Sequence, residues 1–139
     1  MVFRYGAALS LCVVLLVACS IKLKIGVVNN TGEDVTILLG DDELKIISGH
    51  FARFGYPTIA QRRTMQVLMG KCTYTYVFPG AIENYVKVDG FEGVVMVQLE
   101  GDHRIYLIPP KSNGTVLIPN VMSLQSGGFP LTPDKEECI

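Results

Sequence analysis

The chain has 139 residues, a length that suits one domain and is short for two. Of these residues, 49% are hydrophobic and 18% are charged, a composition typical of a folded chain and not of a disordered one. Of its 12 Lys and Arg residues only Arg4 lies within residues 1–18, which leaves 11 against 13 Asp and Glu in the rest of the chain. Because no basic stripe is present to neutralise phosphates, we expect no nucleic-acid partner.

The first part of the chain has the layout of a secretory signal. Arg4 lies near the amino terminus, residues 5–18 are mostly apolar, and small residues close the run. This run is shorter than the roughly 20 residues that a membrane-spanning helix needs. We therefore expect residues 1–18 to be a signal peptide. Residues 19–139 should form a single β-rich domain with a short N-terminal tether and a loop-like C-terminal tail.

The apolar run ends at a cysteine, in the sequence Leu16-Val17-Ala18-Cys19. This sequence resembles the lipobox of bacterial lipoproteins. The resemblance implies cleavage before Cys19 and acylation of Cys19, so that a membrane becomes the partner of the chain. Each buried methylene of such an acyl chain contributes roughly 0.8 kcal/mol to anchoring.

The resemblance also implies a location. Ser20 follows the cysteine, where an aspartate would favour retention in the inner membrane, so we expect the periplasmic face of the outer membrane. The alternatives are an ordinary signal peptide with a coincidental cysteine, which gives a secreted protein, and an uncleaved anchor.

Residues 19–139 show the pattern of an all-β protein. Short runs of β-branched and aromatic residues alternate with turn residues at intervals of roughly eight to twelve positions, and no long window has helical periodicity. This pattern predicts a small antiparallel β-sandwich or a partly open barrel. The predicted strands are residues 21–28, 34–40, 44–47, 51–56, 64–69, 72–78, 84–88, 93–100, 104–108 and 115–118.

Two of these segments have a predicted place in a sheet. Residues 93–100 are apolar on both faces over several positions, which favours a central strand. Residues 21–28 carry Lys22 and Lys24 on one face, which favours an edge strand protected from aggregation. The two-residue connection Gly70-Lys71 predicts a tight hairpin, and Gly101-Asp102 predicts another hairpin between residues 93–100 and 104–108.

The four cysteines separate by position. Cys12 lies in the signal and Cys19 is the expected lipid site, which leaves Cys72 and Cys138 as a pair in an oxidising compartment. A disulfide between them would close a loop of about 67 residues and contribute up to roughly 4 kcal/mol. The alternative is two separate thiols, with Cys138 pairing between chains. No Cys-x-x-Cys spacing is present, so we expect no metal and no cofactor.

Catalysis is not expected from the remaining residues. The two histidines, His50 and His103, each lie beside a predicted turn. Asp102 precedes His103, but neighbours on a strand point to opposite faces. No nucleophile elbow and no zinc-hydrolase motif is present. The acidic residues 41–43 could offer oxygen ligands to calcium, although a solvated hairpin tip is favoured.

Tyr74 and Tyr76 lie two positions apart and therefore share one face of their strand. One interpretation is an aromatic cluster in the core. The other is an exposed aromatic platform for a protein or glycan, with Arg62 and Arg63 as a charged anchor.

The sequence therefore favours a lipid-anchored domain of the cell envelope with a binding or structural role and an unknown envelope protein or glycan as partner. Small lipid-anchored lysozyme inhibitors are an alternative of similar size and β content, and residues 48–56, "SGHFARFGY", have a loose likeness to their motifs. An enzyme with an unrecognised site is the second alternative.

Overall fold

The structure is a computed structural model, which describes residues 22–56, 63–80, 82, 87–89, 92–108, 125 and 127–139. These residues form strands, and among them no helix is long and apolar enough to cross a membrane. The strands are β1 (Lys22–Asn30), β2 (Val35–Leu39), β3 (Asp42–Ile46), β4 (Phe51–Gly55), β5 (Thr64–Met69), β6 (Cys72–Val77), β7 (Lys87–Asp89), β8 (Glu92–Glu100), β9 (Ile105–Leu107) and β10 (Lys135–Cys138).

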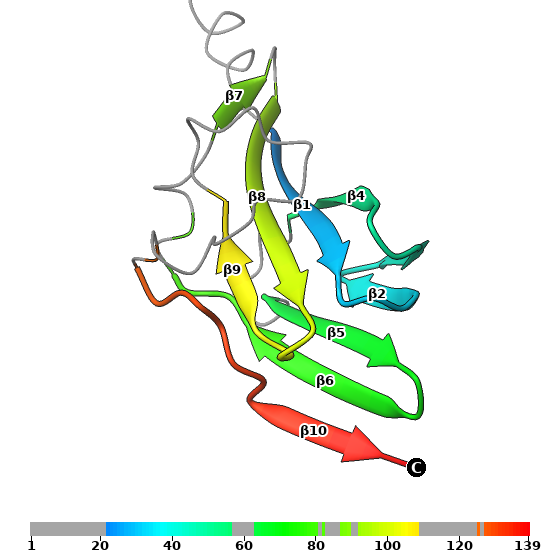
Figure 1. Ribbon diagram of the computed structural model, residues 1–139. Helices are drawn as coiled ribbons and strands as arrows, with labels where there is room; N and C mark the ends of the chain where they lie inside the picture. The colour runs from blue at the N-terminus through cyan, green and yellow to red at the C-terminus, as the bar shows by residue number, and fades with distance from the viewer. Residues whose placement is uncertain are drawn as a thin grey trace, which may run out of the picture.

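The strands form two sheets, which confirms the predicted all-β sandwich (Figure 1). The first sheet has the order β4-β1-β8-β7, and β9 pairs with β8 further along the edge that β7 occupies. The second sheet has the order β10-β6-β5-β2-β3 and is antiparallel throughout. The sheets do not close into a barrel, so each keeps edge strands.

The position of β8 confirms the sequence prediction, whereas that of β1 contradicts it. β8 pairs with three other strands and is central. β1 is not an edge strand, because it pairs with β4 on one side and runs parallel to β8 on the other. Lys22 and Lys24 suggested an edge, but from Ile25 to Asn29 every residue of β1 is buried. The alternation of basic and apolar residues covers only the start of β1, and the buried remainder of the strand does not follow it.

The two predicted hairpins are confirmed. Gly70 and Lys71 join β5 to β6, and Gly70 takes the positive φ of 60° that this turn requires. The β8–β9 connection runs from Gly101 to Arg104, and His103 has a φ of 63° there. Of the predicted strand 84–88, residues 87 and 88 belong to β7, and the predicted strand 115–118 lies outside the described residues.

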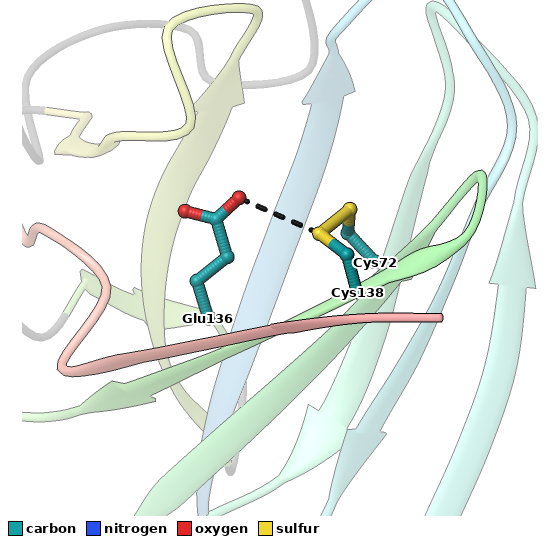
Figure 2. Close-up of side chains that lie close together, drawn as sticks. All are labelled: Cys72, Glu136 and Cys138. Carbon is teal, nitrogen blue, oxygen red and sulfur yellow. Dashed lines mark hydrogen bonds between the residues drawn. A yellow bond between two sulfur atoms is a disulfide. The ribbon is translucent and has the colours of Figure 1, made fainter.

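The C-terminal tail is ordered as a strand, which corrects the expectation of a loop-like segment. Leu131 forms a β-bridge with Ile105 of the first sheet, and β10 then pairs with β6 of the second sheet. The predicted disulfide is present between Cys72 and Cys138, which face each other in the β6–β10 register (Figure 2). The tail pairs as a strand because its polar residues suit an exposed edge and the disulfide fixes its end.

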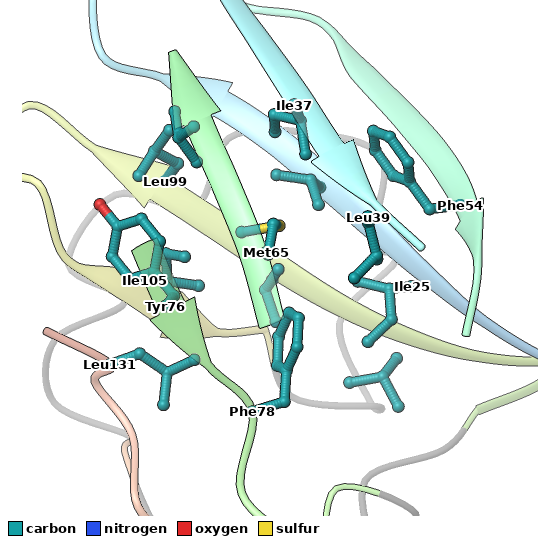
Figure 3. Packing of buried hydrophobic residues seen from close by; sticks show 14 of the residues in the cluster. Ile25, Ile37, Leu39, Phe54, Met65, Tyr76, Phe78, Leu99, Ile105 and Leu131 are labelled. Atoms are coloured by element: carbon teal, nitrogen blue, oxygen red, sulfur yellow. The ribbon is translucent and has the colours of Figure 1, made fainter. Parts of the chain in front are cut away.

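The core lies between the inner faces of the two sheets (Figure 3). Strands β2 and β5 alternate buried and more exposed residues, as expected for a sheet with one face in the core. Side chains from both sheets meet there, and the largest fully buried ones include Tyr76, Phe54, Ile25, Ile37 and Met65.

Candidate functional site

The outer face of the second sheet is an exposed surface built by its three central strands. It consists of the residues of β2, β5 and β6 that alternate with the buried ones. Their side chains are hydroxyl, amide and aliphatic groups. The outer face is formed by Thr36, Leu38, Thr64, Gln66, Leu68, Thr73, Thr75 and Val77, with charged residues of β3 and β10 at its two edges.

The strand register arranges this outer face in two complete cross-strand rows. In each row, directly paired residues continue from edge to edge across all five strands. The first row is Lys45, Thr36, Leu68, Thr73 and Glu137. The second row is Glu43, Leu38, Gln66, Thr75 and Lys135.

The four ends of these rows carry charges of alternating sign. Lys45 and Glu43 lie on β3, and Glu137 and Lys135 lie on β10. Exposed ion pairs join Lys45 to Asp34 at 3.1 Å and Lys135 to Glu137 at 2.7 Å. The hydrogen bond from Lys45, with one from the Ser48 backbone N–H, lowers the pKa of Asp34. Such exposed pairs are weak and can exchange partners.

The outer face is partly apolar. Leu68, on the middle strand, is 39% exposed, and Val77, at the end of β6, is 49% exposed. An aliphatic centre with polar neighbours and charged edges is suited to binding a flat partner. Thr64, Gln66 and Leu68 follow one another at alternate positions of β5, and this alternation is the sequence signal by which the outer face could have been identified.

The aromatic platform predicted as one alternative is not an exposed surface. Tyr74 and Tyr76 are both buried on the inner face of β6, so their interpretation as a core cluster is confirmed. The Tyr76 hydroxyl donates a hydrogen bond of 2.8 Å to the His103 carbonyl oxygen. Burial raises the pKa of both phenols, and near Tyr74 the Glu136 carboxylate raises it further.

Arg63 is the described residue of the predicted charged anchor, and it contacts Tyr56 and Gly80. Arg63 is half-buried, its guanidinium lies 5.6 Å from the centroid of the Tyr56 ring, and its Nη1 donates to the Gly80 carbonyl oxygen at 3.4 Å. These contacts hold Arg63 against the side of the sandwich where Tyr56 meets Phe78. Arg62 lies outside the described residues.

The two histidines lie in different loops. His50 is exposed, and its Nδ1 is 3.2 Å from the Ser48 carbonyl oxygen. The His103 ring lies over Tyr74, with 4.5 Å between ring centroids. Asp102 accepts hydrogen bonds from the Tyr106 hydroxyl at 2.7 Å and from the Arg104 backbone N–H at 3.0 Å, which directs its carboxylate into the β8–β9 turn. These contacts fix the Asp102 carboxylate to Tyr106 of β9 and place the His103 ring against Tyr74 of β6.

One cluster in the described part of the chain has potential metal-ligand atoms within 4.8 Å of one another: Cys72, Glu136 and Cys138. Figure 2 shows the Glu136 carboxylate directed at the sulfur of Cys138, at 3.6 Å. Both sulfurs belong to the disulfide, so neither is available as a thiolate ligand. The disulfide and the β10 register account for this proximity without a metal.

A buried amide that the sequence analysis did not single out joins the two sheets. Asn29 of β1 is fully buried, and its side-chain NH₂ donates to the Glu33 and Ile46 carbonyl oxygens at 2.8 and 2.9 Å. Its Oδ1 accepts hydrogen bonds from the backbone N–H and the hydroxyl of Thr31. All four hydrogen-bonding positions of the amide are therefore used, which makes Asn29 a structural residue.

The expected lipid site, Cys19, lies outside the described residues, as does the whole Leu16–Cys19 sequence. Comparison of the chain with models of protein families, with curated proteins and with solved structures finds no match.

Proposed function

We propose that this protein is a bacterial lipoprotein whose β-sandwich is anchored through acylated Cys19 and has a non-catalytic binding or structural role in the cell envelope. The membrane is the periplasmic face of the outer membrane, and the partner is an envelope protein or glycan. The lipobox resemblance of residues 16–19 supports the anchor. The observation that carries the binding role is the exposed outer face of the second sheet.

The position of β1 adds a spatial argument. Lys22, its first residue, is three positions after Cys19, and an extended chain spans at most about 3.6 Å per residue. An acylated Cys19 would therefore hold the start of β1 within roughly 11 Å of the anchored residue. The β-sandwich would then lie close to the membrane surface.

The anchor is tested by Cys19→Ala in cells that are fed labelled palmitate. We expect the wild-type chain to be labelled and to sediment with membranes, and the variant to be unlabelled and released. A wild-type chain without label, together with a variant that stays in the membrane fraction, would refute the lipoprotein assignment.

The binding role is tested by cross-linking in envelopes followed by capture, with a pair of matched variants. Leu68 on the outer face is 39% exposed, and Leu44 at the inner side of β3 is 41% exposed. We expect Leu68→Arg to abolish capture of cross-linked envelope material, whereas Leu44→Arg should preserve it. If both variants lose capture equally, or if neither loses it, the outer face is not the binding surface.

A further inference from the structure

The two rows of the outer face end in a pattern of charges that complements itself. The first row runs from Lys45 on β3 to Glu137 on β10, and the second runs from Glu43 on β3 to Lys135 on β10. At the ends of the two rows, each edge strand therefore presents one positive and one negative charge, in opposite order. We propose that the partner of this outer face is the same face of a second copy of this chain. This inference rests on the proposed function, because it specifies the partner for the proposed binding role.

The symmetry of the pairing follows from the strand order. β5 is the middle strand of the second sheet. A two-fold axis that runs along β5, between two copies stacked face to face, places β10 of each copy over β3 of the other. Each row then lies over the same row of the second copy. Glu137 meets the second copy's Lys45, and Lys135 meets its Glu43, so all four ends of each face oppose the opposite charge.

The same axis places an exposed apolar residue, Leu68, at the centre of the interface. Leu68 lies on β5, so it contacts Leu68 of the second copy and loses the exposure that it has in the single chain. Gln66, two positions earlier on β5, meets its own counterpart and offers both donors and acceptors to it. The centre is therefore apolar and the rim is charged, as in protein interfaces generally.

Face-to-face pairing is favoured over strand addition at the edges. Both edge strands of the second sheet carry charges, with Glu43 and Lys45 on β3 and Lys135, Glu136 and Glu137 on β10. Charged edge strands oppose the addition of a further strand. The outer face between them has no comparable charge in its centre.

The size of the outer face predicts a weak dimer that anchoring strengthens. Five strands spaced about 4.8 Å apart, with four to six residues each at about 3.3 Å, give a footprint of roughly 400 Å² per copy. A standard interface has about 800 Å² per partner. A two-fold axis keeps the two Cys19 anchors at equal height along it, so both copies fit one membrane, where tethering raises their effective concentration.

The test uses the full-length chain expressed in cells and cross-linked in isolated membranes. Gln66→Cys places a thiol beside the two-fold axis, and Ser48→Cys places one in an exposed turn after the edge strand β3, away from the axis. Mild oxidation should give disulfide-linked dimers of Gln66→Cys at several times the yield of Ser48→Cys. Thr64→Cys, also on β5, serves as a second reporter if Gln66→Cys does not accumulate.

Charge reversal then identifies the contact. In the Gln66→Cys background, Lys45→Glu or Glu137→Lys alone should lower the dimer yield about ten-fold, because each creates two repulsive pairs related by symmetry. The double variant should restore the yield. Lys45 and Glu137 are four strand spacings apart within one copy, roughly 19 Å, so the rescue cannot arise inside a single chain. The single variants also lose the ion pairs Lys45–Asp34 and Lys135–Glu137 within one chain. The double variant does not restore these pairs, so they cannot explain a rescue.

The dimer is overturned if Gln66→Cys and Thr64→Cys cross-link no better than Ser48→Cys, if they link to a different envelope protein, or if the double variant is not rescued. If one of these outcomes is observed while the chain is membrane-bound and labelled with palmitate, the dimer is refuted and the lipid anchor is not. If the chain is instead recovered unlabelled in the soluble fraction, the proposed function fails. The same cross-linking comparison in that fraction still decides the dimer.

Discussion

The outer faces of the two sheets differ in their relation to solvent. On the first sheet, Val28, Gln98 and Tyr106 point away from the core between the sheets, yet they are only 1%, 0% and 2% exposed. On the second sheet, the corresponding positions carry Leu68 and Val77, which are 39% and 49% exposed. At β1, β8 and β9 the first sheet is therefore buried on both faces, although Phe51 on its edge strand β4 is 40% exposed. The second sheet is buried on one face.

The difference shows how strand sequences encode burial. The β8 segment from Gly93 to Leu99 is apolar at nearly every position, whereas β5 alternates between Thr, Gln and Leu outside and Met and Val inside. A strand that is buried on both faces lacks the alternation of a half-exposed strand. The polar groups on the buried outer face have partners, because Gln98 donates to Glu100 and Tyr106 donates to Asp102.

The largest expected effect contrasts the core with the exposed outer face. Leu99→Ala removes a fully buried side chain of β8 and should lower the free energy of unfolding by about 2–5 kcal/mol. Leu68→Ala makes the same change on the outer face of the second sheet and should cost less than about 1 kcal/mol. Urea denaturation of the two purified variants measures both. Similar losses would mean that Leu68 is buried in the folded chain.

The next effect concerns the edge of the second sheet. The disulfide spans 66 positions, and its removal by Cys72→Ser with Cys138→Ser should lower stability by about 2–4 kcal/mol. The reason is that the unfolded chain regains the freedom that the cross-link removed. Thermal unfolding measures the loss. Reducing agent should destabilise the wild-type chain to the same degree and leave the double variant unchanged.

A smaller effect compares the two outer faces directly. Val28→Thr places a hydroxyl on the buried outer face of the first sheet and should cost about 1–3 kcal/mol. Val77→Thr makes the same exchange on the exposed outer face of the second sheet and should change stability by less than about 0.5 kcal/mol. Urea denaturation again measures both variants. An equal cost would contradict the difference in burial on which the comparison rests.

The smallest effect depends on pH. Tyr76→Phe loses the hydrogen bond to the His103 carbonyl oxygen and should cost about 1 kcal/mol at pH 7. Burial raises the pKa of Tyr76 above its ordinary value of 10.0. The folded state therefore retains the phenol proton better than the unfolded state, so this contribution is complete below pH 10 and is lost as the pH rises above it.

The variant should consequently lose less stability than the wild type between pH 9.5 and about 11. Urea denaturation at both pH values measures the two slopes. Identical slopes would show that the Tyr76 phenol is not protected by burial. Tyr74 and Tyr106 also have raised pKa values, so some alkaline loss should remain in the variant.

Much of the second sheet could be predicted from the sequence, because its strands are short, half-exposed and joined by local turns. The bounds of β5 agree with the predicted 64–69, and Gly70-Lys71 forms the predicted turn. The outer face was harder to identify, because the sequence places Tyr74 and Tyr76 on one face without saying which face is buried. The aromatic residues occupy the core, and the less conspicuous Thr73 and Thr75 occupy the surface.

The sequence by itself determined the all-β class, most strands and the hairpins, since these depend on local alternation and turn residues. It favoured the pairing of Cys72 with Cys138 by counting, and the structure shows that disulfide. Only the tertiary structure decided that β1 lies parallel to β8 in the middle of a sheet and that β10 returns to β6. These contacts join segments that are far apart in the chain, and local periodicity carries no information about which distant strand a segment pairs with. The alternating charges at the ends of the outer face have the same origin. Lys45 and Glu137 belong to one row only because β10 completes the sheet.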